Sequence, residues 1–339
     1  MSKKYIKNTR QQSIIFDSGD FESELEASSA TDNDPEFVTN PDTPLTSKPT
    51  PATTTDGALR FISFGSGSSG NCAYIGSETA GILIDAGVDA KKVFDTLALN
   101  GISPDMVKGV CLTHDHGDHV RYVYQISRRY RHIRIYCTPR TLNGILRRHN
   151  ISRRIKDYHE AIFKEIPFTL AGMTLTAFEV SHDGSDNSGF LIEYAENKFV
   201  VATDMGYITD RADFYMKQAN YLMIESNYDD TMLTNGPYKE YLKARIRDTK
   251  GHLDNKVAAQ FVADNYSPEL RYVFLCHLSH DNNTPDVAVG EMRNALENRG
   301  VTVGKGENTL SDRAKDVQVV ALPRFDPSMW YVLRRRNSI

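Results

Sequence analysis

Residues 110–119 read Val-Cys-Leu-Thr-His-Asp-His-Gly-Asp-His. Four potential metal ligands fall within six positions, directly after a short apolar run that predicts a buried strand: His114, His116, Asp118 and His119. Imidazole mixed with carboxylate favours a hydrolytic metal over an iron–sulfur or copper site. His114 and His116 can point to one side of an extended segment, whereas Asp118 and His119 must diverge, so one cluster can serve two metals. A polar loop of solvent-facing histidines is the competing interpretation, and this density of ligands disfavours it.

Composition limits the possible classes of protein. The chain has 339 residues, 40% of them hydrophobic, which is enough to bury a large core. Its formal charge of -4 gives no overall attraction to nucleic acid, so any such binding must come from local charge. The four cysteines, Cys72, Cys111, Cys137 and Cys276, form no CxxC pair, which disfavours a zinc ribbon or a disulfide scaffold. We expect buried free thiols in a reducing compartment.

The first part of the chain differs in composition from the rest. Its longest apolar run, Ile14-Ile15-Phe16, is too short for the core of a signal peptide, so we expect a cytoplasmic location and no membrane partner. Residues 28–56 are dominated by Ser, Thr, Pro, Asp and Asn and offer little to pack. We therefore expect a disordered tail over residues 1–57 and one folded domain over residues 58–339.

The folded part alternates strand-like and helix-like patterns. Strands are predicted at residues 60–64, 71–75 and 80–84, and strand-like segments at 168–180 and 189–203. Helices are predicted at residues 89–99, 120–131, 254–266 and 286–299. This order indicates an α/β (α+β) fold with sheets covered by helices on their outer faces. The Gly/Ser loop at residues 65–71 lacks the Lys-Ser/Thr of a P-loop and precedes a strand, so it is not interpreted as one.

The motif His114-x-His116-x-Asp118-His119 resembles the HxHxDH signature of the metallo-β-lactamase fold hydrolases. Other positions of that signature occur in order at strand ends: Asp85 before the motif, and His182, Asp204 and His277 after it. The Gly/Ser loop, Glu225-Ser226-Asn227 and Gly251-His252-Leu253 are similar to the YycJ/WalJ-type branch, whose members are regarded as DNA exonucleases.

This resemblance implies a four-layer αβ/βα sandwich with two divalent metal ions, zinc or manganese. The implied ligands are His114, His116 and His182 for one metal, Asp118, His119 and His277 for the other, and Asp204 as the bridge. Asp85 is expected to hold a ligating histidine by a hydrogen bond. Asp118 and His252 are the candidate catalytic residues.

Several positions keep an alternative. His277 stands at the end of an apolar strand and is preferred to His280 as the last ligand. His252 is either a polar residue flanking a helix or a group that contacts the scissile phosphate. Asp183 and Asp186 are interpreted as turn or rim residues. Tyr228 follows Glu-Ser-Asn where the family commonly has His, which weakens a proton-shuttling role there.

Residues 120–156 contain no acidic residue and are rich in arginine and tyrosine. Arginine binds phosphate bidentately and tyrosine can stack on unpaired bases, so this segment predicts a nucleic-acid substrate. The candidate contacts are Arg128, Arg129, Arg147 and Arg148. A solvated helical face balanced by acidic residues elsewhere is the alternative.

The sequence therefore predicts a two-metal phosphodiesterase that acts on nucleic acid, DNA rather than RNA, as an exonuclease. A small-molecule hydrolase of the same fold, such as a lactonase or thioesterase, would not need the arginine-rich segment. An RNA-processing nuclease would share both features. A non-catalytic scaffold is disfavoured by the complete set of ligands. Nothing in the sequence predicts an oligomeric state.

Overall fold

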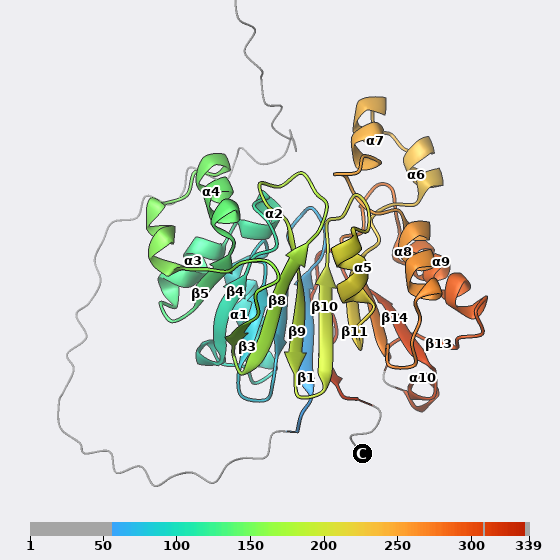
Figure 1. The fold of residues 1–339 in the computed structure, drawn as a ribbon, viewed down its shortest axis with the longest axis horizontal. Helices are drawn as coiled ribbons and strands as arrows, with labels where there is room; N and C mark the ends of the chain where they lie inside the picture. Colours follow the sequence, from blue (N-terminus) through green and yellow to red (C-terminus); the bar gives the residue numbers. More distant parts are fainter. Residues whose placement is uncertain (1–55, 308, 336–339) are drawn as a thin grey trace, which may run out of the picture. The chain divides into compact units, whose positions relative to one another are not determined.

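The computed structural model describes residues 56–307 and 309–335, so all but the last two residues of the predicted tail lie outside the described part. Two β-sheets occupy the centre of the described part, with helices outside them (Figure 1). Within the described residues, no helix is both long enough and apolar enough to cross a membrane.

The first sheet joins an antiparallel half to a parallel half. In order across the sheet its strands are β15 (Tyr331–Leu333), β1 (Leu59–Gly65), β2 (Cys72–Gly76), β3 (Gly81–Ile84), β4 (Val107–Cys111), β5 (Arg134–Cys137) and β6 (His159–Ala161). Pairing is antiparallel from β15 to β3 and parallel from β3 to β6. The carboxyl ends of β3 and β4 therefore lie at the same edge of this sheet.

The second sheet has the same mixed character. In order its strands are β13 (Val303–Gly304), β14 (Val317–Ala321), β12 (Tyr272–Cys276), β11 (Tyr221–Glu225), β10 (Asn197–Ala202), β9 (Ser188–Tyr194), β8 (Met173–Glu179) and β7 (Phe168–Leu170). Strands β10 to β14 pair in parallel and β7 to β10 pair antiparallel. Strand β8 thus runs in the direction of β10, β11 and β12, and all four end at one edge.

Helices and 3-10 turns connect the strands. They are α1 (Ala90–Leu99), η1 (Pro104–Met106), α2 (Gly117–Val120), α3 (Val123–Arg129), α4 (Pro139–Arg148), η2 (Arg153–Tyr158), α5 (Asp210–Met216), α6 (Asp230–Asn235), α7 (Glu240–Ile246), α8 (Asn255–Asp264), α9 (Pro285–Glu297) and α10 (Leu310–Arg313). Three hydrophobic clusters divide the core. One packs α1, α3 and α4 on the first sheet, one fills the space between the sheets, and one packs α5, α8 and α9 on the second sheet (Figure 1). The predicted four-layer αβ/βα sandwich is confirmed.

Helix α1 illustrates how local sequence builds these layers. The side chain of Asp89 caps the helix by accepting a hydrogen bond from the backbone N–H of Lys92. Val93, Phe94 and Leu97 recur at helical spacing and bury one face against the first sheet. The helix begins one residue after the predicted start and ends at the predicted residue.

The strand-like segments 168–180 and 189–203 are each a hairpin and not a single strand. In the first, Ala171 and Gly172 both adopt left-handed backbone conformations, with φ of 55° and 74°. Two such residues form the turn that suits the twist of paired strands. In the second, Ala195 turns the chain with φ of 51°. Alanine is not a typical turn residue, so neither turn was predicted.

Phe61 joins the two sheets. Its ring lies 5.0 Å from that of Phe199 and 4.5 Å from that of Phe274, both on the opposite sheet, and the side chain is fully buried. We expect Phe61→Ala to lower the free energy of unfolding by about 3–5 kcal/mol, because it leaves a cavity between the layers. Urea denaturation measures this. Phe163→Ala, at a ring that is 55% exposed, is the matched control and should cost less than about 1 kcal/mol. Equal losses in the two variants would contradict the layered core.

Candidate metal centre

The candidate ligands lie just beyond the carboxyl ends of strands. Asp85 follows β3, residues 114–119 follow β4, and His182, Asp204 and His277 follow β8, β10 and β12. The parallel strands of each sheet end at one edge, and the two edges meet there. Crevices beyond the carboxyl ends of such strands are the common ligand sites of sheets of this kind.

The described residues contain three groups of side chains that could each hold a metal ion. Within each group, the ligand atoms lie within 4.8 Å of one another. The groups are His114, His116, His182 and Asp204; Asp118, His119 and His277; and Asp204, His252 and His277. The structure thus brings together the seven residues predicted as ligands, and it adds His252 beside them. Asp204 occurs in two of the groups.

Each of the five histidines predicted to bind metal has one ring nitrogen next to an outer partner. The pairs are His114 Nδ1 and Thr113 Oγ1 at 3.0 Å, His116 Nε2 and Asp183 Oδ1 at 3.1 Å, His119 Nδ1 and Asp85 Oδ2 at 2.8 Å, His182 Nδ1 and Gly251 O at 2.9 Å, and His277 Nδ1 and Glu225 Oε1 at 3.2 Å. In a neutral imidazole whose outer nitrogen donates to such a partner, the lone pair of the other nitrogen faces the centre of the cluster. Outer partners of this kind fix the orientation and basicity of metal-binding imidazoles.

The inner nitrogens converge on Asp204. Its Oδ2 atom lies 3.2 Å from His119 Nε2, 3.6 Å from His114 Nε2 and 3.7 Å from His182 Nε2. These imidazoles come from both of the main groups, so one carboxylate oxygen faces both. That is the position a bridging carboxylate would need.

The cluster also contains buried atoms that the protein does not satisfy. His114 Nε2 and His277 Nε2 are buried and have no hydrogen-bond partner among the described residues, and Asp118 Oδ2 lies 3.5 Å from His277 Nε2. Buried polar atoms normally have a partner, and these belong to residue types that ligate divalent cations. The side chains present therefore fit a divalent metal.

Charge differs between the two groups. Burial alone would lower the pKa of His119, but the carboxylates of Asp204 and Asp85 raise it well above its usual value. Burial would also lower the pKa of His277, but Asp204 and other carboxylates raise this pKa to about 10. For His182, burial dominates and lowers the pKa to about 4. When no metal is bound, the nearby carboxylates thus favour the protonated form of His119 and His277. A metal must displace the proton from the inner nitrogen, so its affinity should rise with pH.

Three residues of the site adopt left-handed backbone conformations. Asp85, Asp204 and His277 have φ of 60°, 52° and 54°. Residues other than glycine rarely adopt this backbone conformation, although Asp and His do so more readily than most. Each of the three stands just beyond a strand, where the turn aims its side chain into the cluster.

Residues 81–277 match the family model described as "Beta-lactamase superfamily domain". The chain belongs to the metallo-β-lactamase superfamily. Within it the chain is similar to exodeoxyribonuclease YycJ of Bacillus anthracis, with 31% identity over 247 residues that cover 73% of this chain and 92% of that one. It is also 28% identical to exodeoxyribonuclease WalJ of Streptococcus pneumoniae over 246 residues, covering 73% and 91%. The predicted membership of the YycJ/WalJ-type branch is confirmed.

Solved structures agree on the fold. The metallo-β-lactamase fold protein YhfI from Bacillus subtilis superposes with a TM-score of 0.59 and 14% identity, covering 81% of this chain and 99% of that one. The family and the His/Asp cluster together make this chain a metallo-β-lactamase fold hydrolase with a divalent-metal site.

Glu225 is a residue of this metallo-β-lactamase site that sequence analysis did not assign. Its carboxylate is fully buried at the end of β11 and accepts a hydrogen bond from His252 Nδ1 at 2.7 Å. Burial raises the pKa of Glu225, but His252 and His277 outweigh it and hold the pKa below its usual value. The available signal was a carboxylate that ends an otherwise apolar strand.

Asn71 is a second residue that was not assigned. Its Nδ2 lies 3.0 Å from His119 Nε2 and 3.2 Å from Asp118 Oδ2. Asn71 is the last residue of the Gly/Ser loop, so these contacts bring that end of the loop to the rim of the cluster. No spacing rule connects an amide in that loop with histidines nearly fifty residues later.

The structure shows where Asp183, Asp186 and His280 lie relative to the cluster. Asp183 Oδ1 lies beside His116, as given above, while its other oxygen accepts a hydrogen bond from Arg245 of α7. Asp186 instead bonds to Thr138 and lies outside the three groups. His280 is also outside these groups, so His277 is the histidine that the structure places in the cluster.

The arginine-rich segment of this metallo-β-lactamase fold divides into two parts. Arg147 and Arg148 are in the last turn of α4, where Arg147 Nη2 donates to Ser185 Oγ at 3.1 Å. Ser185 is in the loop that follows His182, so this end of α4 lies at the rim of the cluster. Arg128 and Arg129 end α3, which leads into the start of β5. Because β5 is parallel to β4, its start lies at the sheet edge opposite the cluster. The structure therefore does not bring this second pair to the site.

Proposed function

We propose that this protein is a two-metal phosphodiesterase that acts on nucleic acid, and that its substrate is DNA with a free end. One observation carries the proposal: a single carboxylate oxygen of Asp204 faces both ligand groups, beside a helix end rich in arginine. The names of the two relatives, both exodeoxyribonucleases, support DNA over RNA and ends over internal bonds. A cytoplasmic location stays a prediction from the sequence.

The proposed ligands are those predicted from the sequence. His114, His116 and His182 would hold one ion, Asp118, His119 and His277 the other, and Asp204 would contact both. When bound, two divalent ions acidify water and neutralise charge that develops on a phosphate under attack. Imidazole and carboxylate together suit zinc and manganese. Asp85 would fix His119 for this purpose, through the 2.8 Å contact to its Nδ1 atom.

We infer that His252 acts on the substrate. Its ring centre lies 5.1 Å from those of both His182 and His277, so it borders both ligand groups. Glu225 fixes its orientation from behind by accepting the Nδ1 hydrogen bond. In this arrangement His252 would donate a proton to the oxygen that leaves, or a hydrogen bond to the phosphate. Glu225 is its positioning residue.

One face of α4 offers a basic surface near the cluster. A cavity of about 360 Å³ there is lined by Arg140, Asn143, Arg147 and Ser185. Guanidinium groups bind phosphate oxygens in pairs, so this cavity suits a nucleic-acid backbone. Arg148 has a further internal contact, because its Nε lies 3.4 Å from the fully buried carboxylate of Asp115. Loss of Arg148 would therefore also affect folding.

The test replaces two arginines that line this cavity. In Arg140→Gln/Arg147→Gln, the affinity for single-stranded DNA should depend less on salt, by about 0.7 in the slope of log K against log salt for each phosphate that the variant no longer binds. Turnover of end-labelled oligonucleotides should fall, whereas hydrolysis of bis-p-nitrophenyl phosphate and metal content should not. Arg293→Gln on α9 is the control. Arg128→Gln/Arg129→Gln tests the other predicted pair, which should change the slope without changing turnover if DNA extends that far.

Substrate form separates the remaining alternatives. DNA and RNA with free, blocked or circular ends should be compared in one assay with added manganese. Equal cleavage of circles and free ends would contradict the exonuclease proposal, and faster cleavage of RNA would contradict the preference for DNA. Cleavage of a lactone or thioester with no cleavage of any nucleic acid would refute the nuclease altogether.

A further inference from the structure

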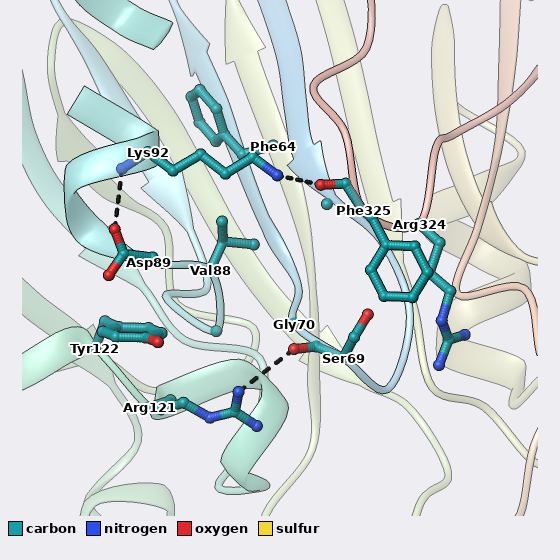
Figure 2. Close-up of a pocket in the computed structure, with 12 residues that line it drawn as sticks. Phe64, Ser69, Gly70, Val88, Asp89, Lys92, Arg121, Tyr122, Arg324 and Phe325 are labelled. Atoms are coloured by element: carbon teal, nitrogen blue, oxygen red, sulfur yellow. Dashed lines mark hydrogen bonds between the residues drawn. The ribbon is translucent and has the colours of Figure 1, made fainter. Parts of the chain in front are cut away.

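A second cavity lies between the Gly/Ser loop, the start of α1 and the segment after β14 (Figure 2). Its volume is about 180 Å³, and its walls include Ser69, Asp89, Lys92, Arg121, Arg324 and Phe325. It is separate from the cavity at α4 and shares no lining residue with it.

The cavity is strongly basic. Three cationic side chains and one carboxylate line it, and that carboxylate, Asp89, already accepts the hydrogen bond of the Lys92 backbone N–H at 3.1 Å. Lys92 Nζ donates to the backbone carbonyl of Phe325, and Arg121 Nη1 lies 3.5 Å from the carbonyl of Ser69 (Figure 2). Carbonyl oxygens accept hydrogen bonds but do not neutralise a positive charge. Lys92 and Arg324 alone outnumber the one carboxylate, so the cavity has an excess of positive charge suited to an anion.

Arg324 is held between this cavity and the metal centre. Its Nη2 donates to Ser68 Oγ at 2.7 Å and its Nη1 to the carbonyl of Leu278 at 2.9 Å. Its Nε atom is buried and has no hydrogen-bond partner in the described structure. Partial burial lowers the pKa of Arg324 although nearby acidic groups oppose the shift. No carboxylate in the described residues lies within ion-pair distance of Lys92 or Arg324.

Glycines let the loop close around the cavity. A Cβ atom on Gly67 would lie 2.8 Å from the guanidinium of Arg324, and one on Gly70 would lie 2.5 Å from the carbonyl of Gly87. Both Gly67 and Gly70 have positive φ, of 148° and 156°. Close contacts with Arg324 and Gly87 therefore determine the shape of the Gly/Ser loop. The cationic side chains of the cavity come from α1, the end of α2 and Arg324, and not from a lysine of the loop itself.

The cavity adjoins the second ligand group. Gly70, in its wall, precedes Asn71, whose side chain touches His119 and Asp118. Arg121 follows His119 by two residues, and Arg324 bonds to the residue after His277. Residues that line the cavity are thus next to residues of the second ligand group along the chain or bonded to their neighbours.

We propose that this cavity binds a phosphate group of the nucleic-acid substrate, next to the phosphodiester that is cut. This identity of the ligand rests on the proposed function. Lys92, Arg121 and Arg324 supply charge-assisted hydrogen bonds to the phosphate oxygens. The ring of Phe325, which is 58% exposed at the cavity, offers a face against which the attached nucleoside packs. An occupied cavity would fix the end of the strand relative to the metals.

The test measures binding of a terminal phosphate. Cleavage-resistant phosphorothioate oligonucleotides of one sequence carry a 5′-phosphate, a 3′-phosphate or hydroxyls at both ends, and anisotropy gives their affinities for the full chain. For the unaltered protein, a phosphate at one of the two ends should strengthen binding about tenfold, as expected for new charge-assisted hydrogen bonds. In Lys92→Gln/Arg121→Gln this gain should fall below about twofold, and Lys92→Arg alone should keep it.

Lys91→Gln is the matched control. Lys91 is the neighbouring residue on α1, pairs with Asp95 at 2.6 Å and does not line the cavity. An absent gain in the unaltered protein, an unchanged gain in Lys92→Gln/Arg121→Gln, or an equal loss in Lys91→Gln would each overturn the proposal. If the gain in affinity depends on Lys92 but the protein cuts no nucleic acid, the proposed nuclease activity is refuted and phosphate binding in the cavity is supported. If the protein cleaves DNA but shows no such gain, only the proposed phosphate binding is refuted.

Discussion

Asp204→Ala is expected to lower the metal content from about two ions per chain to less than one, and to reduce phosphodiester hydrolysis at least about a hundredfold. The reason is the position of Asp204 Oδ2 within 3.2–3.7 Å of inner nitrogens from both ligand groups. Losing this carboxylate removes a donor from both. Elemental analysis of the purified protein measures the ions directly. His116→Ala should weaken loading of the first group in the same assay.

Asp186→Ala is the control for the metal analysis. Asp186 is also a carboxylate near His182 in sequence, but it pairs with Lys164 at 2.6 Å outside the cluster. Its loss should leave both ions in place. Full occupancy in Asp204→Ala would remove the bridging assignment, and equal loss in both variants would point to a general defect of folding.

His252→Ala is expected to lower the rate constant for DNA cleavage by about 10²–10⁴ while both ions remain bound. If His252 protonates the leaving oxygen, bis-p-nitrophenyl phosphate should be affected far less, by under about tenfold, because its leaving group needs little help from an acid. Glu225→Gln should give a smaller loss of the same kind, since it only disturbs the orientation of His252. Steady-state rates on both substrates measure these effects.

A ring nitrogen of His252 lies within 4.8 Å of potential ligand atoms of Asp204 and His277, so these three residues could hold one ion. Metal content must therefore be measured in the same samples. A loss of one ion in His252→Ala would make His252 a ligand in place of a proton donor. Equal losses on both substrates, with the ions retained, would assign it to binding the phosphate.

The sequence predicted those features that local pattern determines. Ligands that follow apolar strands, such as His277 after β12, could be placed because the strand pattern marks where each side chain leaves the sheet. Helix α1 could be placed because its cap and its apolar spacing agree. The hairpin turn at Ala195 could not be predicted, because alanine carries no turn signal and tertiary pairing decides its backbone conformation.

Features that depend on long-range contact were beyond the sequence. Glu225, Asn71 and Asp183 each act through contacts to residues distant in the chain, and no spacing in the sequence indicates such contacts. The arginines show the same limit. Their density predicted a polyanion, but only the topology shows that Arg147 faces the cluster while Arg128 ends a helix that leads to the far edge.

The left-handed backbone at Asp85, Asp204 and His277 affects the stability of the folded protein and therefore its expected abundance. Glycine would adopt these angles with less strain, but it would remove the side chains that the site needs, so the unloaded site is a local cost to folding. An ion that binds only the folded chain offsets this cost by mass action, with about 2.7 kcal/mol at a hundred times its dissociation constant. Unfolded chains are removed by proteolysis, so a gain of this size changes abundance several-fold. We therefore expect the amount of this enzyme to follow the supply of divalent metal even where its rate constant does not change.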